Sequence, residues 1–99
     1  MADDDRQKIK LVYRLHAVER MFERNISEDN VNKIIFGGKV IEKYPDDLPY
    51  PSRLILGFIG NRPIHIVIAD NKIENQIIVI TVYEPSNLKW DESFERRIK

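Results

Sequence analysis

Three basic side chains at regular spacing are the first sign of chemistry in this sequence. His16, Arg20 and Arg24 follow one another at steps of four residues within LHAVERMFER, so on a helix they form one ridge. Histidine, with an ordinary pKa of about 6.5, serves as acid or base near neutral pH, and arginine carries a planar fork of donors that matches phosphate oxygens. The ridge therefore predicts contact with phosphate. Surface ion pairs with Glu19 and Glu23 are the alternative explanation.

A second group of chemical side chains falls in residues 62–85, RPIHIVIADNKIENQIIVITVYEP. The two apolar runs rich in β-branched residues, joined by turn formers, predict a β-hairpin. Successive side chains alternate faces, so one face is aliphatic and the other carries His65, Thr81 and Tyr83. With a turn centred near residues 72 and 73, His65 is expected roughly opposite Thr81. A register slip would remove that pairing, and a hydrogen-bonded core histidine is the alternative role for His65.

The ridge belongs to a predicted helix over residues 16–24. The alternating pattern of residues 9–15 favours a short strand before it, although one long helix beginning at the aspartates of residues 3–5 is the rival interpretation. Leu15, Val18 and Phe22 are expected to face the core, with Ala17 and Met21 beside them.

A second helix is predicted after Ser27, which is a good N-cap, and Gly37 with Gly38 suggests a left-handed C-terminal cap. Strands are expected over residues 39–45 and 53–59, separated by a proline-rich loop, with a tight turn at Gly60 and Asn61 before the hairpin. Residues 86–99 are expected to form a tail or short helix in which Trp90 seals the core. The predicted fold is α+β, with N-terminal helices packed on an antiparallel sheet of about four strands in two layers.

Composition narrows the function classes. The 99 residues predict a single domain over 1–99, with residues 1–8 as a flexible lead-in. The absence of cysteine excludes disulfides and thiolate chemistry, and no metal ligand or cofactor is predicted. No stretch predicts a membrane span or signal peptide, so the expected location is the cytoplasm. The 16 basic and 16 acidic side chains balance, which disfavours strong non-specific binding to nucleic acid.

Several segments together resemble a widespread microbial family. They are LHAVERMFERNIS, a helix that ends in GG, KVIEKYPDDLPYPSRLILG, RPIHIVIA and IIVITVYEP with a tryptophan after it. The family is a domain of unknown function with the signature His-Ala-x-Glu-Arg-Met-x-Glu-Arg-x-Ile-Ser, and it looks like a distant relative of the RelE, BrnT and MqsR type toxins. The resemblance implies a RelE-like domain that cleaves RNA without a metal. It also implies a partner antitoxin, of the zinc-finger kind that accompanies such toxins.

Metal-free cleavage of RNA requires a base for the 2′-hydroxyl, a cation for the phosphorane and an acid for the 5′-oxygen. The residues expected to meet these needs, if the first helix lies beside the polar face of the hairpin, are His16, Arg20, His65 and Tyr83. The residues expected to bind the substrate are Arg24, Arg53, Thr81 and Tyr50, of which Tyr50 and Arg53 flank the proline-rich loop. The alternative functions are a non-catalytic protein-binding module and a catalytically decayed member of the family.

Overall fold

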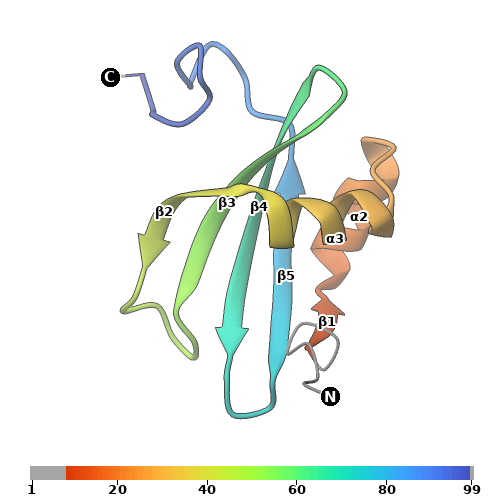
Figure 1. Ribbon diagram of the computed structural model, residues 1–99, viewed down its shortest axis with the longest axis vertical. Coiled ribbons are helices and arrows are strands. Elements are labelled where there is room, and N and C mark those ends of the chain that lie inside the picture. Colours follow the sequence, from red (N-terminus) through yellow and green to blue (C-terminus); the bar gives the residue numbers. More distant parts are fainter. Residues whose placement is uncertain (1–8, 99) are drawn as a thin grey trace, which may run out of the picture.

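A computed structural model describes residues 9–98 of the chain (Figure 1). The predicted lead-in of residues 1–8 lies outside the described residues. The elements in chain order are β1 (Lys10–Tyr13), α2 (Leu15–Glu23), α3 (Glu28–Gly37), β2 (Lys39–Tyr44), β3 (Ser52–Ile59), β4 (Arg62–Asn71) and β5 (Gln76–Tyr83).

The sheet has five strands in the order β1-β5-β4-β3-β2. Neighbouring strands from β2 to β5 are antiparallel, whereas β1 lies parallel to β5, with Val12 opposite Ile78. The predicted α+β class is confirmed, but the expected antiparallel sheet of about four strands is corrected to a mixed sheet of five. The fifth strand is β1, which confirms the short strand predicted within residues 9–15. The extended backbone of Arg14 separates β1 from α2, so the rival single long helix is wrong.

The side of α2 that faces the sheet is not the one predicted. Ala17 and Met21 are its buried residues, and α2 lies over β5. Leu15, Val18 and Phe22 are exposed instead, at 74%, 47% and 88% of their surface. The sequence contains two adjacent apolar rows on this helix, and a short helix at the edge of the layer buries only one of them.

Helix α3 begins as predicted and ends differently. The Ser27 hydroxyl accepts a hydrogen bond from the Asn30 amide at 3.1 Å, and the Asn30 side chain accepts one from the Ser27 amide, which makes a capping box. The helix ends at Gly38 with φ −81° and ψ −177°, which is extended backbone and not the expected left-handed cap. A Cβ at Gly38 would lie 2.5 Å from the Ile34 carbonyl oxygen, so close approach explains this glycine.

The main core lies between the helices and one face of the sheet. Its sheet side includes Ile64, Ile66 and Ile68, and its helix side includes Ala17 and Ile34. Because side chains alternate along a strand, His65 on β4 points to the opposite face. The C-terminal segment, residues 84–98, lies over the part of that second face around His65, and it contains turns and one isolated bridge between Trp90 and Arg97. In Figure 1 this segment is blue and lies at the upper left, whereas the helices lie to the right.

The register of the β4–β5 hairpin is corrected. His65 lies opposite Tyr83, and Thr81 lies opposite Val67. The turn is centred between residues 73 and 74, because Asn71 pairs with Gln76, and a bulge between Val67 and Ile68 adds a further residue to β5. These two offsets move His65 from the expected partner to Tyr83. The predicted tight turn between β3 and β4 is confirmed, since Gly60 has φ 59° and Ile59 pairs with Arg62.

Candidate functional site

The predicted site residues divide between the two faces of the sheet. His16 and Arg20 belong to α2, in the helix layer. His65 and Tyr83 meet on the opposite face, beneath the C-terminal segment. The structure therefore assembles two separate groups and does not bring His16 or Arg20 together with His65.

His65 is fully buried and both of its ring nitrogens have partners. Nε2 lies 2.8 Å from the Phe94 carbonyl oxygen, which can only accept, so Nε2 carries the proton and donates it. Nδ1 then accepts from the Tyr83 hydroxyl at 3.1 Å. The imidazole also makes edge-to-face contacts with Tyr83 and Trp90, with centroids 5.2 and 4.4 Å away. These four contacts describe a neutral histidine that clamps the C-terminal segment to the sheet.

The electrostatics around His65 agree with that description. Burial lowers the pKa of His65, and this outweighs the hydrogen bond to Phe94 and the nearby Glu42 carboxylate, both of which raise it. The Arg97 guanidinium lowers it further. Burial raises the pKa of Tyr83, because in this case it disfavours the deprotonated, charged form. Near neutral pH the pair is therefore uncharged.

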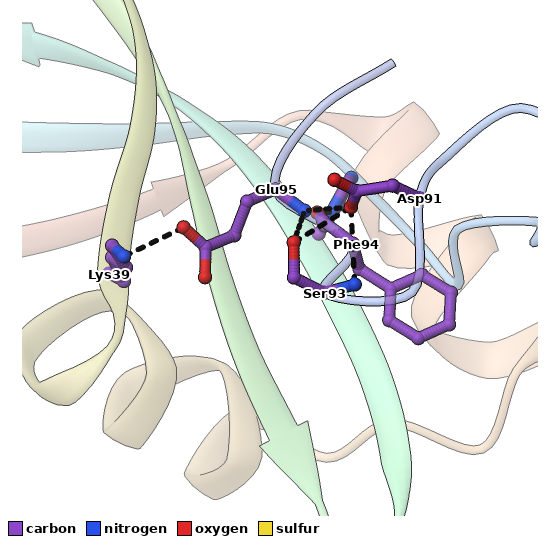
Figure 2. Close-up of polar contacts among 6 residues, drawn as sticks. Lys39, Asp91, Ser93, Phe94 and Glu95 are labelled. Atoms are coloured by element: carbon purple, nitrogen blue, oxygen red, sulfur yellow. Dashed lines mark hydrogen bonds and ion pairs between the residues drawn. The ribbon is translucent and has the colours of Figure 1, made fainter. Parts of the chain in front are cut away.

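The C-terminal segment is also held by charged contacts. Lys39 Nζ on β2 donates to Glu95 Oε1 at 2.7 Å, as Figure 2 shows. Arg97 lies 3.8 Å from Glu42 Oε2 and 4.8 Å from the centre of the Trp90 ring. Glu42 also accepts a hydrogen bond from the Tyr44 hydroxyl, and burial, followed by that bond, raises the pKa of Tyr44. Lys39 of β2 and Arg97 of the segment therefore each form an ion pair that holds the segment against β2.

A tight turn within the segment aims the Phe94 carbonyl at His65. Asp91 Oδ1 accepts from the Ser93 amide and hydroxyl at 3.1 and 2.7 Å, and from the Glu95 amide at 3.3 Å (Figure 2). These bonds, led by the Ser93 hydroxyl, lower the pKa of Asp91. Phe94 adopts φ 61°, a left-handed conformation that the turn imposes on it. The carboxylate of Asp91 thus fixes the acceptor that His65 requires.

Beside this cluster is a small open pocket of about 260 Å³. Its lining residues are Tyr83, Glu84, Pro85, Ser86, Lys89, Trp90 and Arg97. Lys89, Arg97 and Glu42 were not among the predicted site residues. The sequence signals for them were weak. A basic tail is typical of a solvated chain end, and Glu42 is one polar residue in the alternating pattern of a strand.

The α2 ridge is open to solvent. His16, Arg20 and Arg24 are all exposed. Arg20 Nη1 lies 3.2 Å from Glu23 Oε2, and both side chains are about half exposed, so this ion pair is weak and leaves the guanidinium accessible. Arg62 extends the basic surface, because its Nη2 donates to the Arg24 carbonyl at 2.7 Å while its Nε pairs with Glu84 at 3.1 Å.

The remaining predicted binding residues lie apart from the ridge. Arg53 donates twice to Asp70, at 3.0 and 3.2 Å, within the sheet. Thr81 is half-buried opposite Val67, and Tyr50 is half-buried in the proline-rich loop. The structure gives none of these three a bond to His16, Arg20 or His65 among residues 9–98.

Neither a metal site nor a membrane-spanning helix is present in the part of the chain that the structure describes. No group of three or more histidine, aspartate or glutamate side chains there is arranged to hold a metal ion. No helix between residues 9 and 98 is long and apolar enough to cross a membrane.

The comparisons with known proteins give one match. A family model described as a domain of unknown function (DUF4258) matches residues 3–84. No curated protein matches the chain, and no solved structure does.

Proposed function

The chain belongs to the DUF4258 family, a domain of unknown function, and from this premise we propose that it is the toxin of a toxin-antitoxin pair that cleaves RNA without a metal. The proposal includes a RelE-like ancestry, action in the cytoplasm and an antitoxin partner of the zinc-finger kind. Its support is the resemblance of the sequence to small α+β toxins, together with the basic ridge on α2.

The observation that carries the proposal is the exposure of His16 and Arg20 on α2 and of Arg24 at its C-cap. An RNA backbone on this ridge meets two guanidiniums that can each bind phosphate oxygens through paired hydrogen bonds. It also meets the imidazole of His16, which is exposed, whereas His65 is buried. Exposed cations and a solvent-accessible imidazole are the requirements for phosphoryl chemistry on a polymer that cannot enter a deep pocket.

The proposed reaction is a transesterification within the RNA. A base removes the proton of a 2′-hydroxyl, the 2′-oxygen attacks the adjacent phosphorus, and the bond to the 5′-oxygen breaks as that oxygen takes a proton. The products are a 2′,3′-cyclic phosphate and a 5′-hydroxyl. His16 is assigned one of the two proton transfers, and Arg20 and Arg24 are assigned to the charge that grows on the phosphorane oxygens.

His65 and Tyr83 have a different role in this proposal. Their polar atoms are bonded to each other and to the Phe94 carbonyl. We assign them to holding the C-terminal segment, so they support the fold and do not contact RNA.

The test is RNA cleavage by purified protein in the presence of EDTA. His16→Ala is expected to lower the rate by about 100-fold or more, the usual contribution of a positioned acid or base. Arg20→Ala and Arg24→Ala are expected to weaken both RNA binding and cleavage. The matched control is Lys33→Ala, which removes an exposed cation from α3 and should leave cleavage unchanged. Cleavage by His16→Ala at the rate of the unmodified protein would contradict the site.

The second candidate is a protein without catalytic activity, either a protein-binding module or a catalytically decayed member of the family. The observation that favours it is the net charge of zero, since a protein that binds RNA through phosphates gains from a basic surface. Folded protein that cleaves no RNA, and whose expression does not arrest growth, would support this second function over the first.

A further inference from the structure

A row of large apolar side chains on α2 is exposed to solvent in the described part of the chain. Leu15, Val18 and Phe22 are 74%, 47% and 88% exposed, and we call them the α2 stripe. Their spacing of three and then four residues places them on one side of the helix. It is also the spacing of the a, d and a positions of a coiled-coil seam, which packs against a second helix.

The buried core does not include the residues of the α2 stripe. Ala17 and Met21 make the contact of this helix with the core, and both are buried. Leu48, Ile73 and Leu88 are exposed singly in loops and turns, and Phe58 is exposed singly on β3. Single exposed apolar residues are ordinary, whereas a contiguous row marks a contact surface.

The border of the stripe is acidic. Glu19 is four residues after Leu15 and three before Phe22, so its exposed carboxylate lies beside both. Glu23 continues this border and pairs with Arg20 at 3.2 Å. Glu19 has no ion pair with any residue in the range 9–98 that the structure describes. The stripe therefore presents an apolar centre with a negative edge.

We propose that the α2 stripe binds an amphipathic helix of a partner protein, whose apolar face is bordered by lysine or arginine. Leucine-like side chains of that helix fill the spaces between Leu15, Val18 and Phe22, and its cations face Glu19 and Glu23. The basic ridge lies on the other side of Glu19 and Glu23, so a helix on the stripe leaves His16 and Arg24 uncovered. This interface is independent of whether the ridge cleaves RNA.

Charge distinguishes this occupant from a second copy of the chain. In an antiparallel pairing of two α2 helices, Leu15 of each copy lies against Phe22 of the other, and the two Glu19 carboxylates meet near the axis. Like charges brought together at an interface oppose association. Residues 1–8, MADDDRQK, contain three aspartates against one arginine and one lysine, so they lack the basic border that the α2 stripe requires.

The experiment uses two synthetic helical peptides as probes. They share one apolar seam of leucine and isoleucine, and differ only in having lysine or glutamate beside it. Binding of each labelled peptide to the full chain is followed by fluorescence anisotropy. The lysine-bordered peptide is expected to bind more tightly, and less tightly as salt is added. Glu19→Lys combined with Glu23→Lys should reverse the preference.

Variants assign the binding to the stripe. Leu15→Glu and Phe22→Glu are each expected to weaken binding of the lysine-bordered peptide by at least about tenfold. The matched control is Leu88→Glu, a substitution at an equally exposed residue of the C-terminal segment, which should leave binding unchanged. Circular dichroism verifies that each variant is folded.

Four results would overturn the proposal. They are equal binding of the two peptides, binding that survives Phe22→Glu, no binding of the lysine-bordered peptide, and a dimer in light scattering that Phe22→Glu dissociates. The last result would assign the stripe to a second copy.

Discussion

The buried His65 makes the stability of this protein depend on pH in a definite direction. Its pKa in the folded state is lowered by burial, whereas in the unfolded chain it is about 6.5. As the pH falls through about 6.5, the unfolded chain takes up a proton that the folded protein does not bind. The stabilisation is therefore complete above this pH and is lost progressively as the pH falls toward the folded pKa.

The size of the effect follows from one proton. A difference of one bound proton between the two states changes the free energy of unfolding by about 1.4 kcal/mol per pH unit, which is the upper limit of the slope from His65. The charged and titratable groups facing His65 are Glu42, Tyr83 and Arg97. The perturbation is His65→Gln, which keeps one donor for the Phe94 carbonyl and one acceptor for Tyr83 but does not titrate.

The assay is urea unfolding at a series of pH values from about 8 to about 5. Trp90 is the only tryptophan and lies 4.4 Å from His65, so its fluorescence reports this part of the protein. We expect the free energy of unfolding of the unmodified protein to fall below about pH 6.5 more steeply than that of His65→Gln. Subtracting the two curves removes the contributions to the pH dependence that the two proteins share. Parallel curves would refute the assignment of His65 as a buried neutral clamp.

Two further predictions concern the packing and capping of α3. Gly57→Ala would place a Cβ 2.5 Å from Ile34 Cγ1, so it should lower the free energy of unfolding by about 1–3 kcal/mol, whereas Gly37→Ala, with nothing within 4 Å of its Cβ, should be neutral or stabilising. Equal urea midpoints for the two variants would contradict the close contact. Ser27→Ala removes the acceptor for the Asn30 amide and should cost about 1 kcal/mol in the same assay; an unchanged midpoint would show that the capping box is dispensable.

Local signals predicted the start of α3 and the β3–β4 turn correctly. Ser27 before an apolar row defines where a helix begins, and Gly60 with Asn61 between two apolar runs defines a tight turn. These features depend on neighbouring residues alone, so the sequence contains all the information that decides them.

Features set by distant contacts were predicted less well. The choice between the two apolar rows of α2 depends on how Arg14 leads the chain from β1, and the partner of His65 depends on a bulge in β5. The separation of His16 from His65 depends on which face of the sheet the helices cover. The burial of His65 depends on Phe94, which lies 29 residues away in the chain.

The ends of the RNA products test the proposed function most directly. The unmodified protein, incubated with RNA in EDTA, should produce fragments that end in 2′,3′-cyclic phosphate and begin with 5′-hydroxyl, and His16→Ala should reduce their rate of formation by about 100-fold or more while His65→Gln does not. Absence of cyclic phosphate ends, or their formation at the full rate by His16→Ala, would contradict the assignment of the α2 ridge as the site of cleavage.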